Sequence, residues 1–162
     1  MSEQNVELVL ALIPSGADFA EPMRDENFSA LSTVVAHLFQ PDFECVVCRF
    51  DTEKTYVGLD GLRDLWLEWL APWTTYRSEA EDAIDLGDRV LLLVRDFGRR
   101  EGSTDEIALK GASIWNIRDG KIARVEFYPV RDDAVKAADV ATGVAAERGR
   151  REASERRIQP AR

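Results

Sequence analysis

The most informative stretch of the chain reads Tyr56-Val-Gly-Leu-Asp-Gly-Leu-Arg-Asp-Leu-Trp-Leu-Glu-Trp69. From Gly58 onward, large apolar residues recur every three or four positions, with charged residues between them. This spacing predicts a helix that buries one broad aromatic face. The pattern extends to Trp73, but Pro72 lies in what would be the last turn, so we expect the helix to bend or end near Leu70.

Four strand-like stretches follow this helix, at about 75–85, 89–99, 105–117 and 121–129. Gly87-Asp88 and Asp119-Gly120 are typical of tight hairpins, whereas residues 98–104 form a longer polar connection. Apolar and polar residues alternate in the last two stretches, which predicts one buried face for each. The 89–99 stretch is apolar at consecutive positions, as expected for a strand that is covered on both faces.

A sheet of this kind needs a cover on each side. Helices can cover one face of the sheet. A second copy of the chain is the simplest cover for the other face, so the pattern predicts a homodimer that forms through the sheet.

The remaining elements are shorter and less regular. They are predicted, in chain order, as a helix at 2–13, a short helix or loop at 17–29, a helix at 29–39, a strand at 43–50, a polar loop at 51–55 and a helix at 131–147. Pro14-Ser-Gly16 ends the first helix, and Gln40-Pro-Asp42 separates the strand from the helix before it.

Length and composition limit the class of protein. With 162 residues, 45% hydrophobic and 31% charged, the chain fits one globular domain. Its net charge of −9 disfavours nucleic acid as a partner. Residues 147–162 hold six Arg and three Glu, a local charge of +3 that leaves −12 for residues 1–146. We predict one domain over 1–139 and, over 140–162, a helix end and a disordered Arg-rich tail.

No segment reads as a signal peptide or a membrane span. The longest apolar run near the start, Leu8–Ile13, has six residues and follows an acidic stretch without Lys. We therefore predict a cytoplasmic protein with no membrane partner.

Cys45 and Cys48 form a C-x2-C pair, a spacing that zinc and redox sites share. The chain has no second pair, and residues three apart on a strand point to opposite faces, so the pattern favours two reduced, partly buried thiols and no metal site. His37, the only histidine, lies beside the apolar stripe of the 29–39 helix. A packed or partly exposed role is favoured over a catalytic one, because no nucleophile motif accompanies it.

The order of these elements is that of the α+β cone, and Tyr56–Trp69 resembles the Gly-x-x-Gly helix start of the SnoaL-like, nuclear-transport-factor-2-like superfamily. Three further segments agree with the resemblance: Gln40-Pro-Asp-Phe-Glu44, Ile84-Asp-Leu-Gly-Asp-Arg-Val90 and Ile114-Trp-Asn-Ile-Arg-Asp-Gly-Lys-Ile-Ala-Arg-Val-Glu-Phe-Tyr128. Together they span roughly residues 29–139. The resemblance implies an α+β fold in which a curved antiparallel sheet wraps around a long helix, the cystatin-like cone.

The same resemblance implies a deep, largely apolar cavity between the sheet and the helices, with room for one hydrophobic small molecule. The residues expected to line it are Trp66, Trp69, Trp115, Val125 and Phe127. These rings could instead fill the cone as core, since four Trp and seven Phe supply enough volume. The sequence leaves both arrangements open.

Ketosteroid isomerases of this superfamily use a cavity carboxylate of raised pKa to move a proton. The resemblance places their general-base position at Arg49, so Asp51, two residues later, becomes the candidate base if its loop shifts. It places their proton-donating carboxyl at Ser113, whose hydroxyl is not comparably acidic, and this disfavours steroid isomerisation.

Other polar side chains are candidates for the cavity. Tyr56 and Tyr76 could orient a substrate beside the base. Adjacent strand residues point in opposite directions, so either Arg95 or Asp96 faces the cavity. An inward Arg favours an anionic or enolate ligand, and an inward Asp favours proton transfer.

Two functions follow as alternatives. The first is a cofactor-independent acid–base enzyme of the isomerase, cyclase or dehydratase type that acts on a small hydrophobic metabolite, with Asp51, Tyr56 and Tyr76 as the catalytic candidates. The second is a non-catalytic dimeric module that binds a ligand or another protein. The first calls for no cofactor, and no metal site is expected.

Overall fold

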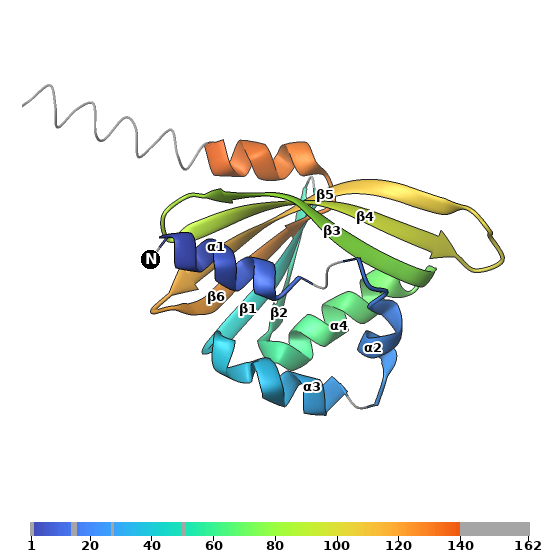
Figure 1. Cartoon of the computed structure of the whole chain (residues 1–162), viewed down its shortest axis with the longest axis horizontal. Helices are drawn as coiled ribbons and strands as arrows, with labels where there is room; N and C mark the ends of the chain where they lie inside the picture. Colours follow the sequence, from blue (N-terminus) through green and yellow to red (C-terminus); the bar gives the residue numbers. More distant parts are fainter. Residues whose placement is uncertain (1, 14–15, 27, 50, 140–162) are drawn as a thin grey trace, which may run out of the picture.

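The chain forms a curved, open sheet of six strands with helices on both faces (Figure 1). This computed structural model describes residues 2–13, 16–26, 28–49 and 51–139. The elements are α1 (Ser2–Ala11), α2 (Ala20–Arg24), α3 (Phe28–Val35), the 3-10 turn η1 (Ala36–Leu38), β1 (Phe39–Arg49), β2 (Thr52–Val57), α4 (Gly58–Leu70), β3 (Trp73–Asp85), β4 (Arg89–Arg100), β5 (Glu106–Arg118) and β6 (Lys121–Tyr128). Residues 131–139 are also helical.

The strands lie in the order β2-β1-β6-β5-β4-β3. Neighbouring strands are antiparallel except β1 and β6, which run parallel. Figure 1 shows α1, α2, α3 and α4 on one side of the sheet and the 131–139 helix on the other. The predicted fold class, an α+β curved sheet around a long helix, is confirmed, with one parallel pair of strands in it.

The long helix α4 begins and ends where the sequence predicts. Gly58 has a φ of 72°, a left-handed conformation that glycine adopts without strain, and there the chain turns from β2 into α4. The helix ends at Leu70, just before Pro72. The Arg24 guanidinium donates hydrogen bonds at 2.6 Å to the carbonyl oxygen of Leu70, which the helix end leaves free, and to that of Trp73, the first residue of β3.

Two predictions for the first strands are wrong. Residues 51–55 are not a loop, because β2 begins at Thr52 and pairs with β1. This is an edge strand that is exposed along almost its whole length. Its residues are therefore mostly polar, which led to the prediction of a loop. The first strand also begins earlier than residue 43. It runs through Pro41 with a register shift against β6 between Phe39 and Glu44, which tolerates the missing N–H of Pro41.

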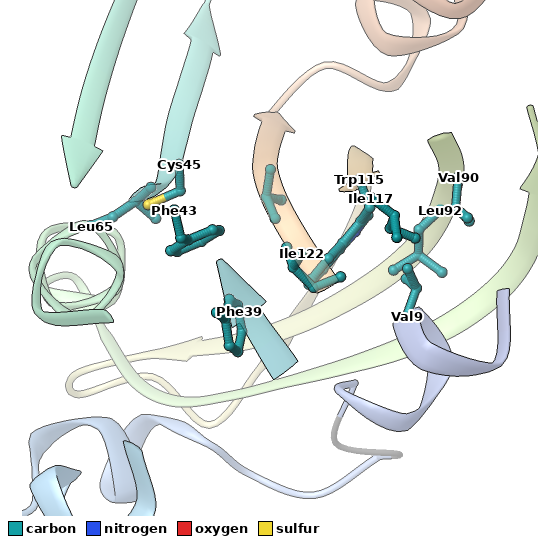
Figure 2. Close-up of a cluster of buried hydrophobic side chains, with 11 residues drawn as sticks. Val9, Phe39, Phe43, Cys45, Leu65, Val90, Leu92, Trp115, Ile117 and Ile122 are labelled. Atoms are coloured by element: carbon teal, nitrogen blue, oxygen red, sulfur yellow. The ribbon is translucent and has the colours of Figure 1, made fainter. Parts of the chain in front are cut away.

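The main core lies between the sheet and the helices that cover its inner face (Figure 2). Figure 2 shows Phe43 and Cys45 of β1 beside Leu65 of α4. The rings of Phe39 and Phe43 meet edge to face with their centroids 4.8 Å apart. Phe43 is 1% exposed, so this ring holds β1 and α4 together.

A second buried cluster lies on the outer face of the sheet. Cys48, Leu91 and Ile114, from three strands, pack there with Ala134 and Ala138 of the 131–139 helix. The chain's own helix therefore covers part of the face for which the sequence predicted a second subunit. The rest of the predicted 131–147 helix and the Arg-rich tail lie outside the described residues.

The two cysteines occupy opposite faces of β1, as the sequence predicts. Cys45 belongs to the inner core and Cys48 to the outer cluster, and both thiols are free. Burial raises the pKa of Cys45 to about 12 and also raises that of Cys48. Among the described residues there is neither a group of His, Cys, Asp or Glu side chains that could hold a metal nor a helix long and apolar enough to cross a membrane.

Candidate functional site

A cavity of about 630 Å³ lies between the inner face of the sheet and helices α1 to α4. This volume is in the range of sites that enclose small organic molecules. Aromatic side chains line the space without filling it. They are Phe19, Phe28, Phe39, Trp66, Trp69, Tyr76, Trp115 and Phe127.

Four of the five predicted wall residues line the cavity: Trp66, Trp69, Trp115 and Phe127. Val125 is buried in the core and is not part of the lining. Trp66 organises this wall, because its ring meets Phe19 and Phe127 edge to face with centroid distances of 5.0 and 5.4 Å.

A polar cluster around Asp96 interrupts the apolar wall. Asp96 of β4 lines the cavity, and its carboxylate accepts hydrogen bonds from two hydroxyls of β3. Ser78 Oγ donates to Oδ1 at 2.6 Å, and Tyr76 Oη donates to Oδ2 at 2.9 Å. Ser78 pairs directly with Asp96 across the two strands, and Tyr76 is two residues away on the same face. The strand register therefore assembles the cluster.

Burial dominates the electrostatics of this cluster. It raises the pKa of Asp96 above that of an ordinary aspartate, and the two hydroxyl donors and the Arg131 charge offset the effect only in part. Burial and the Asp96 charge also raise the pKa of Tyr76, so this phenol stays protonated and acts as a donor. The cavity wall thus holds a carboxyl whose pKa is raised next to a phenol that stays protonated.

The structure resolves the alternative between Arg95 and Asp96. Asp96 shares the cavity face of β4 with Leu92 and Val94. Arg95 is exposed on the opposite face, where its guanidinium lies 5.7 Å from the centroid of the Phe97 ring. The cavity receives the carboxyl and not the cation, an arrangement that favours proton transfer.

Two further polar groups belong to the wall. Trp115 Nε1 donates to Ser113 Oγ at 2.8 Å, and both residues line the cavity. The buried indole N–H of Trp69 has no hydrogen-bond partner within the described part of the chain. It lies near Tyr76 and lowers the pKa of that phenol without reaching normal hydrogen-bond geometry. The Trp69 indole N–H, next to the Asp96 cluster, is therefore a hydrogen-bond donor without an acceptor among the described residues.

Asp51, Tyr56 and His37 lie outside this cavity. Asp51 is exposed in the turn between β1 and β2, so its loop has not shifted inward. The Tyr56 hydroxyl donates to Glu68 at 2.7 Å, next to the exposed ion pair of Glu68 with Lys54. His37 is exposed in η1. Of the two carboxyls, Asp96 has access to a cavity ligand and Asp51 does not.

Sequence reasoning missed Ser78, Phe19 and Asp18. Strand alternation could have found Ser78, since it lies two residues after Tyr76 in a predicted strand. Phe19 and Asp18 left no such signal. They reach the cavity because their segment pairs with β3 through a bridge between Asp18 and Arg77, some sixty residues away in sequence, and the local sequence there predicts only a short helix or loop.

A curved open sheet, a long helix and an apolar cavity between them define a cone-shaped α+β domain. Residues 18–125 match the SnoaL-like domain family, so the chain belongs to that family. No curated protein matches the chain.

Several solved structures share this fold at low sequence identity. A protein described as a SnoaL-like polyketide cyclase, from Jannaschia sp. CCS1, is 17% identical, covers 77% of this chain and 84% of its own, and has a TM-score of 0.59. TerC, co-crystallised with polyporic acid, is 22% identical over 76% of this chain and 89% of its own, with a TM-score of 0.55. A protein of ketosteroid isomerase-like fold from Catenulispora acidiphila, in complex with trimethylamine, is 21% identical over 75% and 84%, with a TM-score of 0.53.

Proposed function

We propose that the chain binds a small hydrophobic molecule in its cavity and moves a proton on it through Asp96, without a cofactor, as an isomerase, cyclase or dehydratase does. One observation carries the proposal: a carboxyl lies in the wall of an apolar cavity and is held by two hydroxyl donors at 2.6 and 2.9 Å. Such a group is a candidate acid–base catalyst, because burial raises its pKa above that of an exposed aspartate and the cavity gives a ligand access to it.

The chemistry needs only the ligand and the carboxyl. Ionised Asp96 takes a proton from a ligand carbon next to a carbonyl, and the electrons of the broken C–H bond pass into the carbonyl as an enolate. The protonated carboxyl then returns the proton to another atom of the ligand. Tyr76 and Ser78 hold the carboxyl in place. The Trp69 N–H is available to the enolate oxygen, because it has no partner among the described residues.

Two further observations support a small organic ligand. The aromatic wall offers flat apolar surface, which suits a ring-containing molecule. Two of the similar structures are complexes with small organic molecules, polyporic acid and trimethylamine, and a third is described as a polyketide cyclase. The proposal extends this kind of ligand to the present chain.

The proposal includes a compartment and an oligomeric state. Two free, buried thiols suit a reducing compartment, so we place the protein in the cytoplasm. A homodimer through the sheet remains the proposed assembly, and Val57, 69% exposed at one edge of the sheet, is a residue that a second copy could cover.

A thermal-shift screen with polyketide, terpenoid and aromatic compounds tests the binding part of the proposal. A compound at about 100 times its dissociation constant stabilises the fold by about 2.7 kcal/mol. Gly111→Val is expected to abolish this stabilisation, because a Cβ at Gly111 lies 3.4 Å from Asp96 Oδ2 and a larger side chain fills the space beside it. The exposed Ala108 lies on the same strand, and its opposite parity places it on the other face, so Ala108→Val is the matched control.

Two results would contradict the binding proposal. One is a wild-type protein that no compound stabilises. The other is a Gly111→Val variant that compounds stabilise as well as they stabilise Ala108→Val.

A further inference from the structure

The segment before α2 lies along the edge of the sheet. Its backbone pairs with β3, since Gly16 N–H donates to the Ser78 carbonyl at 3.3 Å and Phe19 N–H donates to the Tyr76 carbonyl at 3.0 Å. Residues 17–19, with Pro22 and Met23, also form one wall of the cavity. Tyr76 and Ser78 therefore serve two purposes: their backbones hold this segment, and their side chains hold Asp96.

A single carboxylate oxygen adds a side-chain attachment to these backbone hydrogen bonds. Asp18 Oδ1 accepts a hydrogen bond from Tyr76 N–H at 2.9 Å and another from Ala20 N–H, at the start of α2, at 3.1 Å. Tyr76 is thus bonded to Asp18 through its backbone and to Asp96 through its side chain. The Phe19 ring packs edge to face on the Tyr76 ring, with centroids 5.4 Å apart.

The far end of the segment is fixed to α4 by arginines. Arg24 donates to the carbonyl oxygen of Leu70 at the end of that helix and to that of Trp73, the first residue of β3. Arg63 of α4 donates to the carbonyl oxygens of Met23 at 3.1 Å and Asp25 at 2.9 Å. These bonds hold the segment to α4 and to the first residue of β3, but they do not reach Tyr76 or Ser78, so Asp18 carries the side-chain attachment of the segment to the part of β3 that holds the Asp96 cluster.

Resting on the proposed function, we propose that Asp18 is a positioning residue for the cavity acid: through the Tyr76 backbone it keeps the Tyr76 hydroxyl on Asp96 and keeps this wall of the cavity closed to water. Loss of the Asp18 oxygen leaves the Tyr76 N–H without its acceptor and frees the start of α2. Water then reaches Asp96, whose raised pKa depends on burial.

The test is an NMR titration of the Asp96 carboxyl, assigned by comparison with Asp96→Asn. Asp18→Ala is expected to shift the pKa of Asp96 downward, toward that of an aspartate in water, and to speed exchange of the Tyr76 amide about tenfold. Asp18→Asn keeps an acceptor oxygen and is expected to retain the wild-type values. Glu21→Ala removes an exposed carboxylate from the same segment and serves as the matched control.

Other polar and charged groups near Asp96 also affect its pKa and stay constant in this test. Tyr76, Ser78 and Arg131 contribute to its pKa, and Lys110 also lines the cavity; none of these residues is substituted in the variants. A folded Asp18→Ala protein in which Asp96 titrates as in the wild type overturns the inference. If Asp18→Ala does not fold, Asp18→Ser takes its place, because the short Ser hydroxyl cannot reach both N–H groups. Asp18→Ser is expected to show the same downward shift in the pKa of Asp96. An unchanged pKa of Asp96 in Asp18→Ser also overturns the inference.

The titration also separates this inference from the proposed function. A wild-type Asp96 that titrates as an ordinary aspartate contradicts the proposed function and the inference together. A raised pKa that Asp18 variants leave unmoved contradicts only the inference.

Discussion

Replacing Asp96 by Asn is expected to lower turnover of any compound that the wild type converts by at least about 100-fold, the scale of a lost general acid–base group. Asn has nearly the shape of Asp and offers its oxygen to one of the two hydroxyls, while its NH2 group faces the other hydroxyl, but it cannot accept and return a proton. Binding of the compound, followed by thermal shift, is expected to remain, because the aromatic wall is untouched. Steady-state kinetics with the compounds found in the screen measures the loss.

Asp51→Asn is the matched control for this experiment, since it makes the same substitution at an exposed carboxylate outside the cavity. Turnover by Asp51→Asn is expected to equal that of the wild type. If Asp96→Asn keeps full turnover, Asp96 is not the catalyst. If the wild type binds compounds and converts none, the chain is the non-catalytic binding module.

The Asp96→Asn protein also provides a readout of stability against pH. Because the folded pKa of Asp96 is raised, folding disfavours the ionised carboxylate, and the wild type loses stability as the pH rises from the unfolded pKa through the folded one. Asn does not titrate, so the variant gains stability relative to the wild type over that range. Urea denaturation at about pH 3 and about pH 8 measures the change, and a constant difference would argue against a raised pKa.

Phe43→Ala is expected to cost about 3–5 kcal/mol of unfolding free energy, a large part of the 5–15 kcal/mol that holds a domain together. Phe43 is 1% exposed, and its ring lies between Phe39 and Leu65 of α4 (Figure 2). Its loss leaves a void where β1 meets the long helix. Urea denaturation measures the loss.

Two further substitutions serve as controls for Phe43→Ala. Phe43→Leu keeps most of the volume and is expected to cost clearly less than Phe43→Ala. Val34→Ala shortens an apolar side chain that is 68% exposed and is expected to change stability by no more than about 0.5 kcal/mol. A Phe43→Ala protein as stable as Val34→Ala would mean that β1 and α4 do not depend on this ring.

Local patterns in the sequence predicted α4, the four strands after it and the opposite orientation of Cys45 and Cys48. Each of these features depends on a spacing of three to four or of two residues. The strand β2 escaped prediction, because an edge strand such as Thr52–Val57 is stabilised by pairing with β1 and needs no apolar face of its own. The parallel pairing of β1 with β6 likewise leaves no local pattern.

The candidate site was harder to predict than the fold. The sequence limited the inward side chain to Arg95 or Asp96 but could not choose, because both faces of β4 are apolar. The choice depends on register, which places Asp96 opposite Ser78 of β3. Asp51 was the candidate base because it lies two residues after Arg49, where the family resemblance places the general base. A turn between two paired strands holds it at the surface.

The parallel pair of β1 and β6 also bears on how the chain folds. β6 is the last strand in sequence within the described part of the chain, and in the sheet it lies between the β2-β1 half and the β5-β4-β3 half. Until it has left the ribosome, each half has an unpaired strand edge. The N-terminal half must therefore wait for residues about eighty positions later, a non-local closure of the kind that slows folding and leaves nascent chains open to aggregation.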